Sequence, residues 1–432
     1  MSYTRVSQAS VSVDEFQGES AGEELVERAM ENGEVEDPDF GLMFCSVQFE
    51  LEGLASAVED EIPDCEWLGS TTAGEISSTA YGQGNAVILL VETDEIDLRT
   101  SRGDSMFEHP ENAGRSAAEE LVDEEFLSSD REKMLLAYTC GFNLKNMDAP
   151  EHYLLRGIRD VVGSNVPVFG AAGADEYRMT GDVRTFLNGE VHEDSIVMAR
   201  IETDLELHVG LDNGYRDVQR TGVITEMADR RTVAEIDGEP AAEWYADTIG
   251  VDVSDLTSPA TMGSLSKDVR VFLAYAWYRL KGEDPEMVHE SANISRMSPL
   301  ADVLEAGNMR VRVPMSVTDD HGLVFARPPL YEGTQLNVLD ADMEDVLSAA
   351  DRAFDGMSSE RNLFGFVAEC SRRYRIMNDN EDNLVEDQRR LSRAFNAPFV
   401  GFFSYGELGA DDKLNCKFNN QTVTGFVFRR PE

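Results

Sequence analysis

The sequence of 432 residues is poor in lysine, which supplies only six of its 37 basic residues, while 83 residues are acidic. The formal net charge is −46, and the acidic residues are spread along the chain instead of forming a tail. No run of Lys and Arg is long enough to make a basic face, which argues against binding to nucleic acid or to an anionic membrane. Because salt screens repulsion between dispersed like charges, we expect a halophilic protein, although an ordinary acidic protein is the simpler alternative.

Long apolar runs are also missing. No stretch approaches the roughly 20 uncharged apolar residues of a membrane span, and the N-terminal 20 residues lack the apolar segment of a signal peptide. The sequence therefore predicts a soluble, cytoplasmic protein. The few cysteines contain no C-x-x-C pair, which favours reduced thiols over a disulfide framework or a zinc site. They are Cys45, Cys65, Cys140, Cys370 and Cys416.

Motifs for metals and nucleotides are absent as well. The six histidines show neither H-x-H nor H-E-x-x-H spacing, so we expect no metal site built by the protein. The chain contains no Walker A sequence, and no complete G-x-G-x-x-G motif supports nucleotide binding.

What the sequence does contain is one order of elements written three times. A strand-length apolar run, a helical pattern, a second strand, a glycine turn and two further strands begin at residues 41, 133 and 363. The three turns read "LGSTTAGEI" over 68–76, "VFGAAGADE" over 168–176 and "VGFFSYGEL" over 400–408. We therefore predict an α/β fold of two domains, with mixed sheets built from repeated β-α-β-turn-β-β units, and we attribute the repetition to internal duplication.

The same pattern suggests domain limits. Residues 1–38 form an acidic N-terminal lead-in with one helix, and residues 39–215 hold the first two repeats. Residues 216–432 form the second domain, in which a hairpin, a helix and a strand meander precede the third repeat. The hairpin is expected to turn at Asp237-Gly238.

The glycine turns are the first candidates for a binding site. When the first glycine of each turn is aligned, Glu75, Glu176 and Glu407 fall in register. Exposed N–H and hydroxyl groups there could hold a carboxylate, and the acids could receive an ammonium group. The alternative is a tight connection in which each glutamate bonds to local N–H groups. The candidate ligand-binding residues of the turns are Ser70, Thr71, Thr72, Glu75, Gly170, Asp175, Ser404, Tyr405 and Glu407.

Other candidates lie outside the turns. A cysteine is found at the end of each first strand, and Cys140 is the one that we include in the candidate site. Arg372, in "ECSRRYR" over 369–375, could grip a ligand carboxylate through two hydrogen bonds, whereas a surface ion pair is the simpler role. Asn420 and Thr422, in "NNQT" over 419–422, could contact a ligand or merely form a turn.

These residues resemble a known family. "WLGSTTAGEI" and the stretch from "VPVFGAAGADE" to "SIVMARI" look like a FIST N domain, and "EIDGEPAAEWYADTIG", "GFFSYGELG" and "FNNQTVTGFVF" look like a FIST C domain. The resemblance covers roughly residues 40–430 and marks the chain as a haloarchaeal type of acidic FIST protein. The family's C-x-R element appears as Cys370-Ser371-Arg372, within an unusual arginine-rich run.

The resemblance implies a cytosolic sensory protein of signal transduction that is not an enzyme and has no cofactor. It would bind a small polar ligand such as an amino acid and act on an unidentified signalling partner, here as a stand-alone version. One alternative is a haem-based nitric oxide sensor, for which His192 and His208 are the histidines to examine first. A second alternative is a hydrolase of small amides or esters that uses Ser404. The spacing G-x-x-S-x-G around Ser404 departs from the G-x-S-x-G elbow of hydrolases.

The charge of the chain gives the first testable prediction. If dispersed acidic charge destabilises the fold, the midpoint of thermal unfolding should rise as KCl is raised from 0.1 M towards molar concentrations, because screening weakens the repulsion. Differential scanning fluorimetry across a KCl series measures this. A midpoint that does not respond to molar KCl would contradict the halophilic interpretation.

Overall fold

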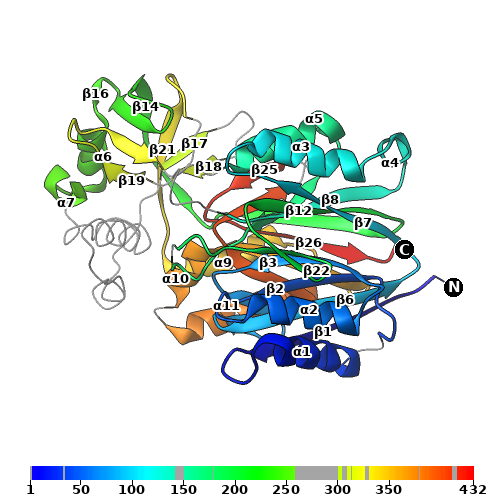
Figure 1. The fold of residues 1–432 in the computed structure, drawn as a ribbon. Helices are drawn as coiled ribbons and strands as arrows, with labels where there is room; N and C mark the ends of the chain where they lie inside the picture. The colour runs from blue at the N-terminus through cyan, green and yellow to red at the C-terminus, as the bar shows by residue number, and fades with distance from the viewer. Residues whose placement is uncertain are drawn as a thin grey trace.

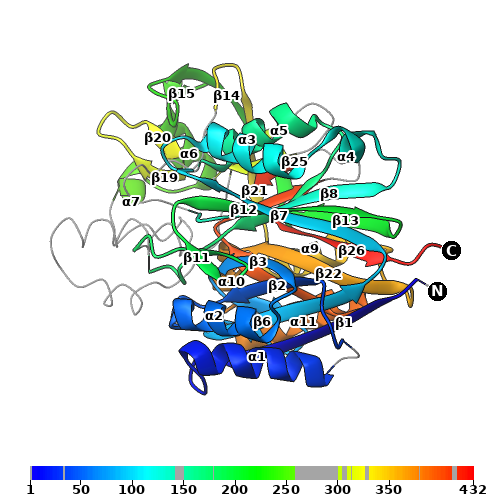
Figure 2. The same cartoon turned by 45° about the vertical axis from the view of Figure 1, so that its right-hand side comes forward.

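The structure, a computed structural model, describes residues 2–32, 35–141, 150–178, 180–257, 300–303, 309–312, 314–325, 330–378, 380–410 and 416–432. Its main body consists of three six-stranded sheets, and a fourth sheet lies beside one end of that body (Figures 1 and 2). We call the three parts of the body units 1, 2 and 3, and the part with the fourth sheet the insert. The predicted fold class, α/β with mixed sheets built from repeated units, is confirmed.

Units 1 and 2 follow one another along the chain. Unit 1 contains β1 (Thr4–Ser12), α1 (Gly18–Asn32), β2 (Phe40–Cys45), α2 (Leu51–Glu61), β3 (Glu66–Thr71), β4 (Glu75–Ser77), β5 (Tyr81–Gly82) and β6 (Asn85–Thr93). Unit 2 contains β7 (Ile96–Asp104), α3 (Pro110–Leu121), α4 (Glu124–Ser128), β8 (Glu132–Thr139), α5 (Glu151–Val162), β9 (Val168–Ala172), β10 (Thr185–Leu187), β11 (Glu190–His192) and β12 (Ser195–Thr203).

Unit 3 is interrupted by the insert. It contains β13 (Glu206–Asp212), α9 (Met343–Ala353), β22 (Asn362–Cys370), α10 (Ser371–Met377), α11 (Glu381–Phe395), β23 (Phe399–Ser404), β24 (Gly406–Ala410), β25 (Cys416–Asn419) and β26 (Val423–Arg429). The insert contains β14 (Arg216–Met227), β15 (Thr232–Ile236), β16 (Glu239–Pro240), α6 (Ala241–Ile249), α7 (Val253–Thr257), β17 (Leu300–Val303), β18 (Met309–Arg312), β19 (Pro314–Val317), β20 (Leu323–Phe325) and β21 (Gln335–Asp340). Part of the region predicted over 216–360 lies outside the described residues.

All three sheets of the body have the same strand arrangement. A parallel pair lies at the centre of each sheet, namely β2 and β3, β8 and β9, or β22 and β23. The last long strand of the unit pairs antiparallel with the first strand of that pair, and β1, β7 or β13 pairs with this last strand. The carboxyl ends of the parallel strands therefore point to the same end of the body in all three units.

The short hairpins that follow the turns do not return to the sheets of their own units. The hairpin β4–β5 of unit 1 pairs with β23 of unit 3, β10–β11 of unit 2 pairs with β3 of unit 1, and β24–β25 of unit 3 pairs with β9 of unit 2. Each unit thus completes the sheet of another unit, in a closed cycle. Each of the three sheets reaches six strands through the two-stranded hairpin that another unit contributes.

The close approach of strands explains the first glycine of each turn. A Cβ atom at Gly69, Gly170 or Gly401 would lie between 1.6 and 1.9 Å from a carbonyl oxygen of the neighbouring parallel strand. No side chain fits at that distance, so these glycines are required for packing. The repeated "G" of the sequence is therefore a requirement of the sheet, whatever the turns do.

The inner faces of the three sheets enclose a central core. The rings of Phe44, Tyr138 and Phe402, one from each unit, lie with their centroids 4.6 to 6.0 Å apart. The corresponding positions on the adjacent strands carry the smaller residues Ser70, Ala171 and Ala368. Three large and three small side chains thereby fill one layer of the core.

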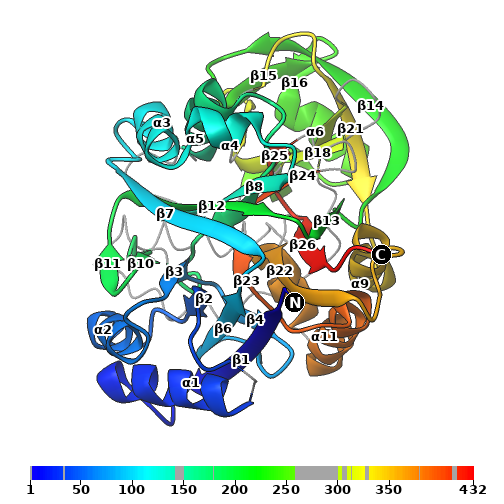
Figure 3. The same ribbon diagram turned by 90° about the vertical axis from the view of Figure 1, so that its right-hand side faces the viewer.

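The helices cover the outer faces, as Figure 3 shows from the end that carries both termini. Helices α1 and α2 pack on unit 1, α3 to α5 on unit 2, and α9 to α11 on unit 3, each group over its own apolar cluster. The insert has a separate core around Ile224, Tyr245 and Phe325. Among the described helices, none is both long enough and apolar enough to cross a membrane.

The N-terminal segment differs from the expected lead-in. Residues 4–12 form β1, which pairs with the whole length of β6, and α1 packs against α2. The alternation of small and polar residues in "TRVSQASVS" hides this strand in the sequence, since only Ala9 and Val11 contribute fully buried apolar side chains to it. The lead-in is thus part of unit 1.

The central core gives the second prediction. Phe402→Ala should lower the free energy of unfolding by about 3–5 kcal/mol, because it removes a fully buried ring from a layer shared by three units. Urea denaturation at constant KCl measures this, with Val385→Ala at an exposed position of α11 as the control. Equal effects of the two substitutions would contradict the packing described above.

Candidate functional site

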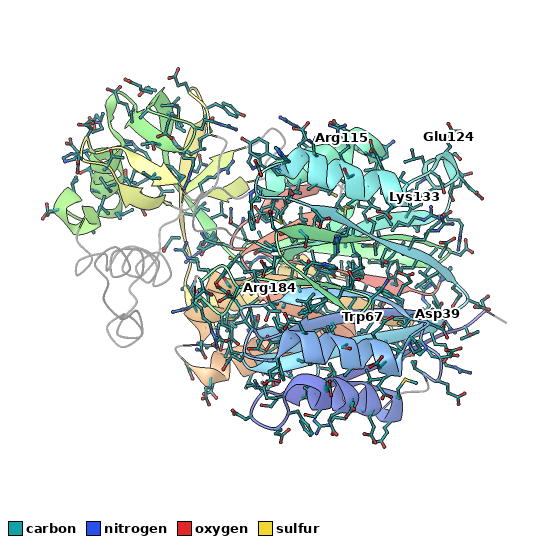
Figure 4. All side chains as sticks on the ribbon, viewed as in Figure 1. Asp39, Trp67, Arg115, Glu124, Lys133 and Arg184 are labelled. Carbon is teal, nitrogen blue, oxygen red and sulfur yellow. The ribbon has the colours of Figure 1, made fainter. Side chains whose placement is uncertain are left out.

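The three glycine turns meet at one end of the body. Each turn is joined to the next by a backbone hydrogen bond: Ala73 N–H to Phe403 O (2.9 Å), Ala174 N–H to Thr71 O (2.9 Å) and Tyr405 N–H to Ala172 O (3.1 Å). Arg184, which contacts the first of these turns, lies at this end in Figure 4, whereas Asp39 and Lys133 mark the opposite end. The inserted sheet lies on the side of the turns (Figure 1).

Within its turn, Glu407 is held by protein groups. The Ser404 hydroxyl donates to Glu407 Oε1 at 2.8 Å, and the Thr422 hydroxyl and backbone N–H donate to Oε2 at 2.7 and 3.2 Å. Ser404 Oγ in turn accepts the N–H of Gly406. All of these side chains are buried. Glu407 therefore fastens the turn to the start of β26.

Glu75 repeats this arrangement in unit 1. Its Oε1 accepts the Thr72 hydroxyl, its Oε2 accepts the backbone N–H of Asn85 at 2.9 Å, and Thr72 Oγ1 accepts the N–H of Gly74. Burial raises the pKa of Glu75 well above its usual value, although these hydrogen bonds oppose the rise. The second role considered for the acids, bonding to local groups, is the one that the structure describes.

Unit 2 departs from the alignment of the sequence. Glu75 pairs with Phe402 in the sheet of unit 3, and Glu407 pairs with Ala171 in the sheet of unit 2. In the sheet of unit 1, the equivalent residue is Thr185, which pairs with Ser70. The Thr185 hydroxyl lies 2.7 Å from that of Ser195, at the start of β12. Thr185 follows Glu176 by nine positions in the chain, so Glu176 lies outside the register that the sequence predicted.

The cysteines are also shifted by one position. Cys140 donates its backbone N–H to the carbonyl of Ser195, at the start of β12, and Cys370 donates to that of Thr422, just before β26. In unit 1, Ser46 and not Cys45 makes the equivalent bond. Cys45 therefore lies one position earlier in its unit than Cys140 and Cys370 do, and it packs into the outer core of unit 1. Burial raises the pKa of Cys140 and of Cys370, which keeps both thiols protonated and poorly nucleophilic.

The two acids of the middle turn join different units. Glu176 accepts the Ser46 hydroxyl at 2.6 Å and the Gln48 amide at 2.9 Å, both from unit 1. Asp175 accepts the Tyr405 hydroxyl of unit 3 and the backbone N–H of Thr180. These acids are thus bonded across the places where the units meet.

Aromatic residues cover the converging turns. The Tyr405 hydroxyl accepts the backbone N–H of Tyr177 at 2.9 Å, and the Tyr177 hydroxyl donates to the carbonyl of Ser371 in α10. The guanidinium carbon of Arg375 lies 3.8 Å from the centroid of the Tyr177 ring, a cation–π contact. Helix α10 is therefore fixed directly over the turns.

The arginines of α10 point in different directions. Arg373 is buried and forms ion pairs with Glu369 (2.7 Å) and Asp387 (3.4 Å), so it is not a surface residue. Arg372 is also buried, and its charge opposes the rise of the Tyr245 pKa, which burial brings to about 12. The charge of Arg372 therefore acts on Tyr245, which belongs to α6 of the insert.

Gln421 is the polar residue that the sequence did not single out. Its side chain is only 1% exposed, and its Oε1 accepts the hydroxyl of Tyr215, at the link from unit 3 to the insert. Its amide nitrogen is buried and has no hydrogen-bond partner among the residues that the structure describes. The backbone groups of Arg372 and Gln421 both oppose the rise of the Cys370 pKa, which places both residues close to this thiol. The sequence does contain a signal, because Gln421 lies in "NNQT" between the two predicted residues Asn420 and Thr422.

The remaining predicted residues have structural positions. Thr71 exchanges bonds with the backbone of Arg184 at 2.9 and 3.0 Å, and Gly170 is required by strand packing. Asn420 is half-buried in the turn before β26. Ser70 faces the central core, where its hydroxyl has no hydrogen-bond partner.

The histidines named for a haem do not offer a free ligand. Both ring nitrogens of His192, on β11, lie within 3.1 Å of Arg102 Nη1. His208 lies on another sheet, in β13, and its Nε2 is 3.4 Å from Glu206 Oε2 of the same strand. Burial lowers the pKa of His192, and the charge of Arg102 adds to this effect. Both histidines therefore have protein partners, and haem binding by either one stays a prediction.

Comparison with known families agrees with the repeated turns and their order. The FIST N domain matches residues 39–239, and the FIST C domain matches residues 241–410. The chain belongs to the FIST family. FIST domains are sensory domains that bind small ligands in signal transduction. The FIST C match begins at α6 of the insert and includes most of unit 3, whereas β14 and β15 of the insert lie within the FIST N match.

Other comparisons add little. No curated protein matches the FIST chain. Among solved structures, it is similar to cyanuric acid hydrolase from A. caulinodans, with 10% identity and a TM-score of 0.25 over 46% of this chain and 71% of that one. This likeness is too weak to support a conclusion about the FIST chain.

The bonding of Glu407 gives the third prediction. Ser404→Ala should lower the free energy of unfolding by about 1–3 kcal/mol, because it removes a donor to a buried carboxylate. Ser348→Ala, which removes a bond to Glu344 on the exposed face of α9, is the control. Urea denaturation compares them, and a Ser404→Ala variant as stable as the control would contradict the structural role of Ser404.

Proposed function

We propose that this FIST protein senses a small ligand that carries a carboxylate group, such as an amino acid. The ligand would bind where α10 and the turn before β26 face the insert. The observation that carries this proposal is the buried amide nitrogen of Gln421, which has no partner. A buried donor left unpaired costs about 1–3 kcal/mol, and a ligand oxygen would recover that cost.

The surroundings of Gln421 favour an anionic ligand group. Tyr215 already donates to the Gln421 carbonyl oxygen, which orients the amide nitrogen away from it. Arg372, on the other side of Cys370, brings a positive charge to the same wall. A neutral donor next to a guanidinium suits a carboxylate, because hydrogen bonds to ionised groups are stronger than neutral ones.

The acids of the turns have a different role in this proposal. Glu75 and Glu407 already accept protein donors on both oxygens, so a ligand ammonium would have to compete with these bonds. We therefore assign the ligand's carboxylate to Gln421 and Arg372 and leave its remaining groups unassigned.

The insert would carry the signal. Tyr215, in the link to the insert, donates a hydrogen bond to Gln421 of unit 3. The charge of Arg372, also in unit 3, acts on Tyr245 in α6 of the insert. A ligand bound between these groups would shift the insert towards one of two positions, because the ligand would bind that position more tightly than the other. A cytoplasmic signalling partner would then read that position. In the same proposal the protein is halophilic, has no catalytic activity, and arose by internal duplication.

Ligand binding gives the fourth prediction. A thermal-shift screen of amino acids and small carboxylates in molar KCl should find at least one compound that raises the unfolding midpoint. Gln421→Glu should reduce the affinity for that compound at least tenfold, because it keeps an oxygen for Tyr215 but replaces the donor with a negative charge.

The matched control is Gln335→Glu, which adds the same charge at an exposed position of β21. It should leave the affinity within about twofold, as isothermal titration calorimetry can measure. A ligand that binds both variants as tightly as the original chain would exclude Gln421 from the site. The absence of any stabilising compound would contradict the sensory proposal itself.

A further inference from the structure

A cluster of charged residues is buried beneath α10, apart from the proposed ligand site. Arg373 Nε donates to Glu369 Oε2 at 2.7 Å, its Nη2 to Asp387 Oδ1 at 3.4 Å, and its Nη1 to the carbonyl of Val346 in α9 at 2.9 Å. The Tyr81 hydroxyl donates to Asp387 Oδ2. Glu369 and Asp387 are completely buried, and Arg373 is 2% exposed.

The charges of this cluster do not balance. Two carboxylates and one guanidinium leave a net charge of −1 in the apolar outer core of unit 3, where an uncompensated charge is strongly destabilising. Glu369 Oε1 also has no hydrogen-bond donor, although it is buried. Asp387 lies within hydrogen-bonding reach of Glu369, and two ionised carboxylates cannot bond to one another.

One proton resolves both problems. We propose that Glu369 and Asp387 share a single proton, which makes the cluster neutral and supplies the missing donor to Glu369 Oε1. The proton is thus a bound ligand of the folded protein, at a site that is independent of the ligand site around Gln421.

The cluster joins elements from two units. Glu369 ends β22, Arg373 lies on α10, and Asp387 lies on α11, whereas Tyr81 comes from β5, in the hairpin that unit 1 contributes to the sheet of unit 3. The remaining contact, from α9, is an uncharged carbonyl. The four titratable or charged groups of the cluster are therefore the ones that set its protonation.

The geometry makes the contribution of this cluster to folding stability depend on pH. Burial first and the charge of Glu369 second raise the pKa of Asp387 well above its usual value, and the charge of Arg373 opposes them. Because the folded chain then binds a proton that the unfolded chain has lost, stability is greatest at low pH within this window and falls as pH rises towards the folded pKa. Loss of the proton would leave a buried charge between α11 and the exchanged hairpin.

The fifth prediction tests this pH dependence of folding stability. The folding equilibrium constant of the unmodified chain, measured by urea denaturation at fixed KCl between pH 6 and pH 9, should fall by up to about tenfold per pH unit. In Asp387→Asn the fall should be shallower by up to about tenfold per pH unit, because an amide supplies a donor without a titrating proton, whereas Glu75 and the buried thiols keep their own contributions. Asp351→Asn, in an exposed ion pair with Arg390, should keep the slope of the unmodified chain.

Glu369→Gln is the second test variant, since it replaces the other partner by a neutral group. It too should fold, and its slope should be reduced by the same amount as in Asp387→Asn. Parallel pH profiles of Asp387→Asn and the unmodified chain would overturn the proposal. So would failure of both neutral variants to fold, because an amide beside a carboxylate carries the same charge as the pair that shares a proton.

Discussion

The exchange of hairpins among the three units is the constraint on which the rest of this structure depends. Each unit gives two short strands to the sheet of another unit, and the cycle closes after three steps. A chain that must pass from its own sheet to a neighbouring one within a few residues has little freedom at the crossing. The crossing residues are the glycine turns, so closure of the cycle brings all three to the same end of the body.

This constraint explains the chemistry of the turns. A buried carboxylate in Glu75 or Glu407 replaces backbone pairing at the point where the chain leaves one sheet for another, and hydroxyls of Thr72 and Ser404 complete its bonds. In unit 2, a longer loop makes the crossing and Thr185 takes the place of the acid. The acids therefore serve the architecture, while the sensing role falls to residues next to them, where α10 and the turn before β26 face the insert.

Local features of the sequence predicted much of this fold. Helical spacing of apolar residues marks the helices Leu51–Glu61 and Glu381–Phe395 in the sequence, because an apolar stripe on a polar helix is visible in one dimension. The exchange of hairpins was not predictable, since strand pairing between distant segments leaves no local pattern. For the same reason alignment put Glu176 in the place of Thr185 and Cys45 in the place of Ser46. The roles of Arg373 and Gln421 were not predictable, because they follow from burial, which depends on contacts with α9, α11 and the link to the insert.

The central claim is that the three units form one cooperative body because each completes the sheet of another. Native-state hydrogen exchange with increasing urea, read out peptide by peptide, tests this most directly. If the claim holds, the amides of β3, β9 and β23 and those of the hairpins paired with them will exchange through a common opening with a single free energy. Separate opening energies for the three units, each hairpin following the unit that it comes from in the chain, would contradict it.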